Sequence, residues 1–333
     1  MLHASVRSTL AVLSALPVVA ALSSSPAQAV DLFVAGTIGE VYKGDSATGG
    51  FAYFGGICLA PAHALAIDNA NIYVGDLNGG ILRLDLATGE FMELYWVPGD
   101  ATDIVMHDQD LLVSTSLGEI HRVDPVTGVV ESTLVGPNGI QAMLVVGDDL
   151  FVSSALEGII WKGDAVTGNF QYFGCGCSGP AQGLAHDDSY LYAGDEFGAY
   201  IRYDLSTGAL LDEGFFPFDI SAMVRDGDDL LLSESNGTIH RINPLDPWAG
   251  ELDTLISPIA IAAMEILPGG VEPPCPADIT GDRVVNVLDL IDLLLCFGQP
   301  ALPGCQREDV NGDGNVNVLD LIDLLLNFGQ TCT

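Results

Sequence analysis

Two acidic loops near the C-terminus have the residue types and the spacing of calcium ligands. The second loop places oxygen-bearing side chains at alternate positions, with a further acid at the twelfth position. Its expected ligands at positions 1, 3, 5, 7, 9 and 12 are Asp309, Asn311, Asp313, Asn315, Asn317 and Asp320. A calcium loop needs this spacing because alternate side chains turn inward, Gly314 at position 6 allows the sharp turn, and position 7 uses its carbonyl. The pattern therefore predicts a Ca²⁺ site.

An earlier copy of the loop begins 31 residues upstream and has weaker chemistry. Its expected ligands are Asp278, Thr280, Asp282, the carbonyl of Val284, Asn286 and Asp289. Arg283 stands where the second loop has glycine, so it must adopt an unfavourable backbone angle and it places a positive charge near the ion. We expect two Ca²⁺ sites, of which the second is the stronger. Asp-rich turns that bind no metal are the alternative for each loop.

Each loop leads directly into an apolar segment that predicts a helix, at residues 287–298 and 318–329. Short, proline-containing connections precede both loops, so neither has room for an entering helix. Two loop–helix repeats without entering helices resemble a type I dockerin, and the resemblance covers residues 275–332. This resemblance implies a small all-α domain that folds with calcium and binds tightly to a cohesin domain on a scaffold or a cell surface.

The resemblance also assigns a partner-binding face to the two helices. By their positions in the family, its residues are Val287, Leu288, Leu294, Leu295, Val318, Leu319, Leu325 and Leu326. Because both repeats present the same residues, binding in two orientations is a hypothesis that follows. Dockerins usually deliver polysaccharide-degrading cargo, so the resemblance implies a role in polysaccharide catabolism as well.

The seven cysteines of the chain favour disulfides if the protein is exported. Four of them lie in the dockerin-like segment, where three connectivities are possible. The preferred pairs there are Cys275–Cys332 and Cys296–Cys305. In the preceding segment we expect Cys58 to pair with either Cys175 or Cys177, which leaves one thiol over.

A repeat of about forty residues fills the middle of the chain. The motif D-x-x-T-G recurs with a spacing of 39 or 40 residues between its threonines, Thr48, Thr88, Thr127, Thr167 and Thr207. A degenerate sixth copy occupies residues 243–250. Short apolar strands with Gly, Asp and Asn turns at this period predict a mainly β fold, a six-bladed β-propeller. An open solenoid is the alternative.

The first repeat lacks the strand that opens the others, and residues 261–267 supply a spare strand after the last repeat. We therefore expect this C-terminal strand to complete the first blade and close the ring. The expected organisation is a signal peptide at 1–29, the propeller at 30–268, a Pro/Gly linker at 269–274 and the dockerin-like domain at 275–333. The general likeness to bacterial quinoprotein-like and WD-type repeats is architectural and assigns no catalytic residue.

Symmetry within the repeats bears on function. Residues 55–76 match residues 174–195 at an offset of 119, so the ring looks like a duplicated three-blade half. One basic residue occupies the same place in every repeat, namely Lys43, Arg83, Arg122, Lys162, Arg202 and Arg241. In five repeats an Asp two positions later shares its face of the strand. A cationic ring that holds an anionic ligand is one interpretation. A structural tie between strands or blades is favoured, because binding sites usually break symmetry.

The charge of the chain excludes some classes of partner. The 333 residues carry 45 Asp and Glu against 10 Lys and Arg, a formal net charge of −35, which disfavours nucleic acid and anionic membranes. Arg7, an apolar run at 10–22 and small residues up to Ala29 predict a secretory signal peptide cleaved near Ala29. No other segment approaches membrane-spanning length. We therefore expect a secreted or cell-surface protein.

Two functions are compatible with these patterns. The favoured one is binding or scaffolding, in which the dockerin-like module docks the propeller onto a cohesin-type partner and the propeller mouth takes a carbohydrate or a protein. The alternative is a carbohydrate-active enzyme of hydrolase, lyase or lactonase type with its active site in the propeller mouth. The chain shows no nucleophile elbow and no phosphate loop, so no catalytic residue is assigned. His121 and His240, related by the offset of 119, are expected to be packed ring residues.

Overall fold

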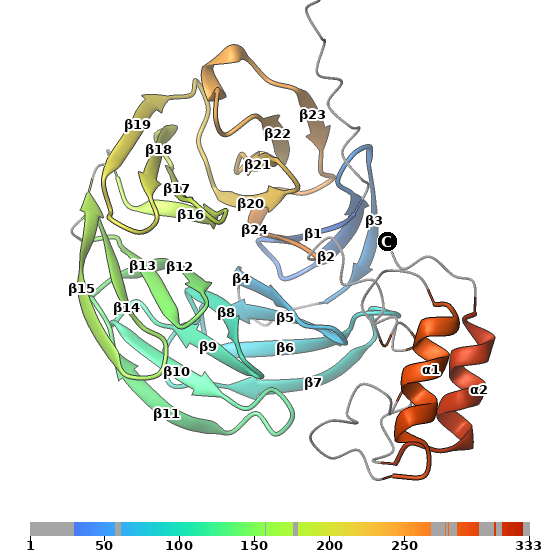
Figure 1. The fold of residues 1–333 in the computed structure, drawn as a ribbon. Helices are drawn as coiled ribbons and strands as arrows, with labels where there is room; N and C mark the ends of the chain where they lie inside the picture. Colours follow the sequence, from blue (N-terminus) through green and yellow to red (C-terminus); the bar gives the residue numbers. More distant parts are fainter. Residues whose placement is uncertain are drawn as a thin grey trace, which may run out of the picture.

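The computed structural model describes residues 30–56, 61–156, 158–175 and 179–267, together with 277, 279, 285–299, 310 and 315–328. The expected signal peptide and linker lie outside these residues, as does most of each calcium loop. Within the described residues, 24 strands form six four-stranded sheets, which are arranged as the blades of a ring (Figure 1). The predicted six-bladed β-propeller is therefore confirmed.

The strands of each blade are given from the centre of the ring to its rim. Blade 1 contains β24 (Ile261–Ile266), β1 (Asp31–Gly36), β2 (Val41–Asp45) and β3 (Gly49–Gly55). Blade 2 contains β4 (Ala62–Ile67), β5 (Asn71–Asp76), β6 (Gly80–Asp85) and β7 (Phe91–Trp96). Blade 3 contains β8 (Asp103–His107), β9 (Asp110–Ser114), β10 (Glu119–Val123) and β11 (Val130–Val135).

The second half of the ring repeats this order. Blade 4 contains β12 (Ile140–Val146), β13 (Asp149–Ser154), β14 (Ile159–Asp164) and β15 (Gly168–Cys175). Blade 5 contains β16 (Ala181–His186), β17 (Tyr190–Asp195), β18 (Ala199–Asp204) and β19 (Leu210–Phe215). Blade 6 contains β20 (Ala222–Asp226), β21 (Asp229–Ser233), β22 (Thr238–Ile242) and β23 (Asp253–Ile256), with a short 3₁₀ turn, η1 (Pro247–Ala249), before its last strand.

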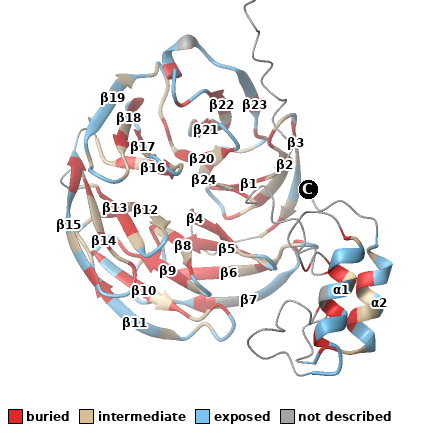
Figure 2. Cartoon of the chain, in the orientation of Figure 1, coloured by how far each residue is buried: buried red, intermediate tan, exposed pale blue. Residues whose placement is uncertain are grey.

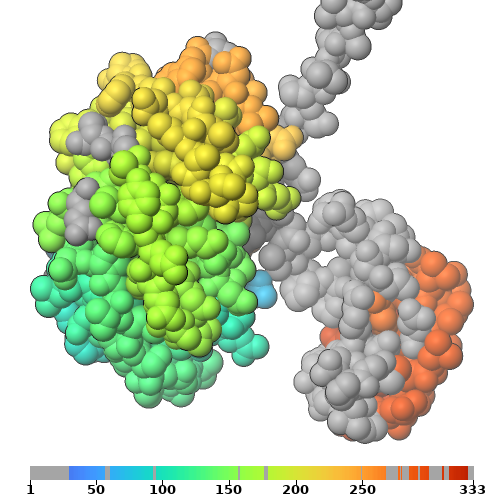
Figure 3. All heavy atoms as spheres, turned by 60° about the vertical axis from the view of Figure 1, so that its left-hand side comes forward, coloured from blue at the N-terminus to red at the C-terminus, as the bar shows by residue number. Residues whose placement is uncertain are grey.

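Burial falls from the centre of each blade to its rim (Figure 2). The second strands, such as β5 and β13, are buried on both faces because a neighbouring blade packs against each side of the sheet. The rim strands β11 and β19 expose most of their residues to solvent. Apolar residues from adjacent blades form the core clusters, and the blades from green to orange make one continuous packed body in Figure 3.

The ring is closed by a strand from the end of the propeller. β24 pairs antiparallel with β1, with Val34 opposite Met264 and Leu32 opposite Ile266. Blade 1 therefore combines one C-terminal strand with three N-terminal strands, as expected from residues 261–267. Because β24 also lies against β20 and β4, this strand joins the last and the second blade as well as completing the first.

The D-x-x-T-G motif forms a side-chain-capped turn between the third and fourth strands. In blade 2, Asp85 Oδ1 accepts hydrogen bonds from the backbone N–H groups of Ala87 and Thr88 and from the Thr88 hydroxyl. These hydrogen bonds to Thr88 and Ala87 lower the pKa of Asp85, and bonds of the same kind lower the pKa of Asp124, Asp164 and Asp204. The Asp of the motif therefore caps its own turn.

Four of the six repeated basic residues tie one blade to the next. Each arginine donates to a backbone carbonyl in the capped turn of the following blade: Arg83 to Pro125 (2.7 Å), Arg122 to Ala165 (2.9 Å), Arg202 to Pro244 (3.0 Å) and Arg241 to Ser46 (2.6 Å). The two lysines, Lys43 and Lys162, form ion pairs within their own blades, with Asp31 and Asp149. The guanidinium fork explains the difference, since it has enough donors to reach a carboxylate and a carbonyl together. The structure thus favours the structural tie over a ligand-binding cationic ring.

Two helices follow the propeller, α1 (Val287–Cys296) and α2 (Val318–Leu326). They contact each other and share a small core that includes Val285, Leu293, Val316 and Leu324. No helix in the described part of the chain is long and apolar enough to cross a membrane. Among the described residues the C-terminal segment shows these two short helices, and the expected all-α dockerin-like domain stays a prediction.

The arginine ties lead to a stability prediction. Arg241 and its partner Asp226 are both almost fully buried, and Arg241 also bonds to Asp229 and to Ser46 of blade 1. Replacing Arg241 by Met should lower the free energy of unfolding by about 3 kcal/mol, because it leaves buried carboxylates without their partner. Lys162→Met, at the equivalent place in blade 4, should cost less than about 1 kcal/mol because its ion pair is exposed. Urea unfolding of both variants checks this, and equal losses would contradict the proposed ties.

Candidate functional site

The two helices begin with the same capping arrangement, built from the last residues of the calcium loops. Asn286 caps α1 by accepting from the Leu288 N–H (2.8 Å), and Asp289 Oδ2 accepts from the Asn286 N–H (2.8 Å). Asn317 and Asp320 repeat both bonds at the start of α2. A negative side chain at a helix N-terminus is favoured by the helix dipole. The residues at positions 9 and 12 of each loop are thus held against the start of the helix.

The structure places five of the twelve predicted calcium ligands. The described ones are Asn286, Asp289, Asn315, Asn317 and Asp320. Asp278, Thr280, Asp282, Val284, Asp309, Asn311 and Asp313 lie outside the described residues. Asp289 and Asp320 are fully buried, so their carboxylates face the interior of the unit rather than solvent. Among the described residues no cluster of three or more His, Cys, Asp or Glu side chains is able to hold a metal ion, and calcium binding stays a prediction.

The fit of a Ca²⁺ ion to these residues rests on the chemistry of the donors. Calcium prefers carboxylate, carbonyl and amide oxygens, which are the groups that the described loop residues supply. The capping boxes fix the backbone at positions 9 and 12 in both repeats, including the weaker first loop. The described residues of both loops therefore supply oxygen donors of the type that Ca²⁺ accepts.

The outer sides of the two helices form an apolar surface, here called the helix face. Its eight residues are the predicted partner-binding residues Val287, Leu288, Leu294, Leu295, Val318, Leu319, Leu325 and Leu326, which are 51–75% exposed. Ile291, Phe297, Ile322 and Phe328 extend it with further exposed apolar side chains. Solvent-exposed apolar clusters of this kind mark interaction sites in soluble proteins. The structure thus brings all eight residues to the surface in two matching sets. Exposed residues run along both helices in Figure 2.

The cysteines are only partly placed. Cys296, at the end of α1, is a disulfide-bonded residue whose partner lies outside the described residues, as do Cys275, Cys305 and Cys332. Cys175 is free and exposed, so the pairing of Cys58 with Cys175 is wrong. Cys58 and Cys177 lie outside the described residues.

The innermost strands surround a narrow central channel with a volume of about 110 Å³. Its polar lining includes His63, Gln141, Gln182, Asp103 and Glu265. Gln141 donates to Gln182 across the boundary between blades 4 and 5 (2.9 Å). This volume holds a few water molecules and lies below the range of pockets that enclose organic ligands.

Asp103 and Glu265 break the symmetry of the channel. Strand register puts Asp103 where the other blades have Ala64, Ala142, Gly183, Ala222 and Ala263. Glu265 stands where the other blades have alanine, valine or leucine. Sequence reasoning missed both residues, although aligning the innermost strands of the repeats would have shown one acid in an otherwise apolar column.

The two channel carboxyls are held in different ways and both favour the protonated form. Asp103 accepts from the Met143 N–H of blade 4 (2.5 Å) and from the Ile104 N–H (2.8 Å), so it links two innermost strands. Burial raises the pKa of Asp103 to about 7, against the opposing effect of these two bonds. Burial, with a smaller contribution from the nearby charge of Asp103, raises the pKa of Glu265 to about 8. Burial also lowers the pKa of His63, which keeps that imidazole neutral.

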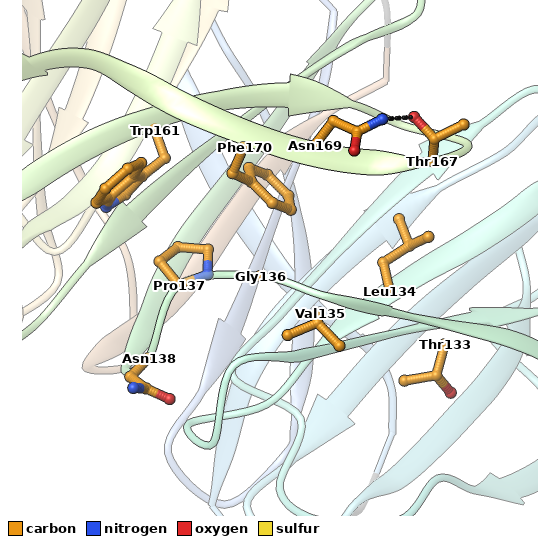
Figure 4. Close-up of a pocket in the computed structure, with 10 residues that line it drawn as sticks. All are labelled: Thr133, Leu134, Val135, Gly136, Pro137, Asn138, Trp161, Thr167, Asn169 and Phe170. Carbon is orange, nitrogen blue, oxygen red and sulfur yellow. Dashed lines mark hydrogen bonds between the residues drawn. The ribbon is translucent and has the colours of Figure 1, made fainter.

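A second cavity is an open groove of about 690 Å³ between blades 3 and 4 (Figure 4). Trp161 and Phe170 of blade 4 lie opposite Leu134 of blade 3 and Pro137 of the connection between the two blades. The polar groups in its lining are amides and hydroxyls, among them Asn169, which donates to the Thr167 hydroxyl (2.8 Å). The groove lining contains aromatic faces and neutral hydrogen-bonding groups, which suit a neutral ligand.

The two related histidines are packed into the ring, as expected. His121 is bonded to the Thr133 hydroxyl (2.9 Å) and to the Pro98 carbonyl (3.0 Å). His240 pairs with Glu234 (2.7 Å) and stacks on Phe218 with ring centroids 3.8 Å apart. The two histidines occupy equivalent places in the duplicated halves of the ring, but they have different hydrogen-bond partners.

The channel carboxyls lead to a prediction about pH. The folded state keeps the proton of Glu265 up to about pH 8, whereas the unfolded chain releases it near its ordinary value, so stability falls as pH rises between these values. Glu265→Gln should remove this loss. The Glu265 side chain still opens onto the channel, so channel water reduces the energetic effect of the pKa shift. We therefore expect the free energy of unfolding of the variant to exceed that of the wild type by about 2 kcal/mol above pH 8, which is about 4–8 °C in Tm. At about pH 4 the variant and the wild type should melt alike.

The control for this prediction is Glu213→Gln, which alters an exposed glutamate on the rim strand β19. It should leave the pH profile of Tm unchanged. A Glu265→Gln variant with the same pH profile as the wild type would show that Glu265 ionises at its ordinary pH in the folded protein.

Comparison with known proteins identifies the fold. No protein-family model and no curated protein sequence matches the chain. The chain is similar in structure to a chain in the crystal structure of a nidogen/laminin complex, with a TM-score of 0.63 and 16% identity over 71% of this chain and 98% of that one. The structures of U3-55K and of the RRP9 WD40 repeats each align with a TM-score of 0.56 and 12% identity, over 70% of this chain and 80% and 79% of theirs. At such identities the likeness shows the fold alone: a six-bladed β-propeller with WD40-like structural neighbours.

Proposed function

We propose that this protein is a secreted docking protein, in which the C-terminal loop–helix pair binds calcium and attaches the propeller to a cohesin-type partner on a scaffold or a cell surface. The observation that carries the proposal is the helix face, whose residues are repeated in both helices and are at least half exposed. A unit as small as this one gains stability by burying such side chains, so leaving them exposed favours a partner that covers them.

The internal repetition gives the helix face two copies of the same apolar residues. α1 and α2 present the same apolar residues from helices with the same caps, so the pair carries two copies of one set. A partner that recognises one set will therefore also recognise the second set. Binding in two orientations follows from this arrangement.

Calcium has a structural role in the proposal. Asp289 and Asp320 are buried carboxylates, and an ionised carboxylate in the interior needs compensating positive charge. A Ca²⁺ ion supplies this charge and joins each loop to the first turn of its helix. The ligands of the first loop include Asp278 and Asp282, and those of the second include Asp309 and Asp313.

Secretion agrees with the rest of the proposal. The predicted signal peptide ends near Ala29, and a disulfide at Cys296 suits an oxidising compartment outside the cytosol. A neutral carbohydrate is the ligand class that best suits the groove between blades 3 and 4, because its lining combines aromatic faces with amide and hydroxyl groups. The groove lining holds no carboxylate pair of the kind that glycoside hydrolysis requires, so the groove itself suits binding rather than hydrolysis.

The calcium prediction is tested by calorimetry on the full chain after treatment with EDTA. The wild type should bind two Ca²⁺ ions, with the second loop the tighter. Asp313→Ala should weaken the tighter site at least tenfold and Asp282→Ala should weaken the other, because each removes a carboxylate ligand. Asp323→Asn removes a similar charge from α2 outside the loop and should change neither site. Absence of any calcium binding by the wild type would refute this part of the proposal.

The docking prediction is tested by surface plasmon resonance on immobilised type I cohesin domains. Leu294→Asp and Leu325→Asp alter one helix each and should weaken binding by no more than a few-fold, because the other repeat remains available. The double variant should lose more than 100-fold, and EDTA should abolish binding by the wild type.

Val126→Asp places the same charge on an exposed apolar residue of the propeller and serves as the control. It should bind cohesin as the wild type does. A wild-type protein that binds no cohesin in calcium would overturn the docking proposal, whereas a full loss in one single variant would exclude the two orientations only.

A further inference from the structure

One face of the propeller carries the turns between the second and third strands of every blade, and it is called the turn face. These turns are residues 37–39, 77–79, 116–118, 155–158, 196–198 and 235–237, residue 157 being outside the described part. The connections between blades lie on the same face, since they bond to the turns: Gly136 N–H donates to Gly118 O (2.7 Å) and Ser257 N–H to Gly237 O (2.8 Å). Turns and connections therefore form one surface around the ring.

Five of the six turns expose one large apolar side chain. These residues are Ile38 (70% exposed), Leu77 (39%), Leu117 (72%), Leu156 (75%) and Phe197 (61%). The turn of blade 6 has Ser235 and Asn236 instead. Single exposed apolar residues are ordinary, but one in each of five successive blades on the same face makes a ring of anchors.

The charges around this ring are negative. Glu40, Glu119, Glu196 and Glu234 lie in or next to the turns. Asp100 and Asp219 lie in the connections and accept from the N–H groups of Ser116 (3.0 Å) and Ser235 (2.9 Å). The turn face is therefore an apolar ring with an acidic surround.

No lysine or arginine of the described propeller offsets this charge, and the basic groups near it are histidines, such as His240, which pairs with Glu234. The seven Lys and Arg residues in 30–56, 61–156, 158–175 and 179–267 all bond on the opposite face, near the capped turns or the turns between first and second strands. Arg225, for example, donates to the Gly227 carbonyl (2.7 Å) and lies 3.6 Å from Asp187. The inter-blade ties thus leave the turn face without lysine or arginine.

Proline recurs in the connections of the turn face. Each connection between blades contains one proline: Pro61, Pro98, Pro137, Pro180, Pro217 and Pro258. Proline fixes its own backbone angle φ, so the four fully described connections, 97–102, 136–139, 216–221 and 257–260, lose less freedom at that position when a partner binds. The opposite face has fewer large apolar side chains. Three of its six capped turns carry Ala47, Ala87 or Ser206 at the place where the other three carry valine or leucine.

We infer that the turn face is a docking surface for a cationic protein segment, in which apolar anchor residues are flanked by Lys or Arg. The five apolar turn residues receive the anchors, and the acidic residues around them pair with the flanking positive charges. This inference does not depend on calcium or on the helix face, and it assigns the propeller a partner of its own.

The test uses the full chain and two synthetic peptides of equal charge, one alternating lysine with leucine and one alternating lysine with serine. Fluorescence anisotropy at about 0.15 M salt should show at least tenfold tighter binding of the leucine peptide by the wild type. Leu117→Ser, Leu156→Ser and Phe197→Ser together should remove this preference, because three of the five anchor sites are lost.

The matched control is Val126→Ser, Val166→Ser and Leu245→Ser together, which alters three exposed apolar residues in the capped turns of the opposite face. This variant should keep the tenfold preference, and both triple variants should melt as the wild type does because the altered side chains are exposed. Equal affinity of the wild type for both peptides, no binding of either peptide, or loss in both triple variants would overturn the inference. A wild-type dimer that the turn-face variant cannot form, without peptide binding, would show instead that this face joins two copies.

Discussion

The propeller depends on the pairing of β24 with β1, because a blade can bury both faces of its sheet only between two neighbours. Without β24, blade 1 would lack its innermost strand, and blades 6 and 2 would each expose apolar residues. Arg241 reinforces the same boundary, since it crosses from blade 6 to the Ser46 carbonyl of blade 1. The closure of the ring therefore rests on a strand pairing at the centre and a charged hydrogen bond farther out, which together make the six blades one cooperative body.

Symmetry separates the structural residues from those that need another explanation. The aspartates of the D-x-x-T-G turns repeat in five blades and do one job, which is to cap a turn. The arginine ties repeat in four blades, and the two lysine exceptions fall in blades 1 and 4, which the internal duplication relates. Asp103 and Glu265 occur once each, in a channel too small for an organic ligand, where burial favours their neutral forms. Asp103 bridges two blades, so its departure from symmetry has a structural use.

The acidic side chains have different roles in different parts of the protein. On the opposite face, carboxylates pair with basic residues such as Arg122 and Arg241 or cap turns, and on the turn face they surround exposed apolar side chains. At the helix pair, buried carboxylates lie at helix N-termini beside an apolar outer face. The protein therefore presents two exposed apolar surfaces in different electrostatic settings, and these settings favour different partners.

The repeat period by itself determined the number of blades, the closing strand and the turn positions, because each blade is a local unit whose strands and turns are coded within about forty residues. The loop spacing likewise predicted the helix starts at Val287 and Val318, since capping depends on residues three positions apart. Only the tertiary structure decided which groups meet across blades: that Arg83 reaches Pro125, that Asp103 and Glu265 share the channel, and that five turn residues from Ile38 to Phe197 lie on one face. These contacts join residues from different repeats, and a pattern within one repeat carries no information about the distance between two of them.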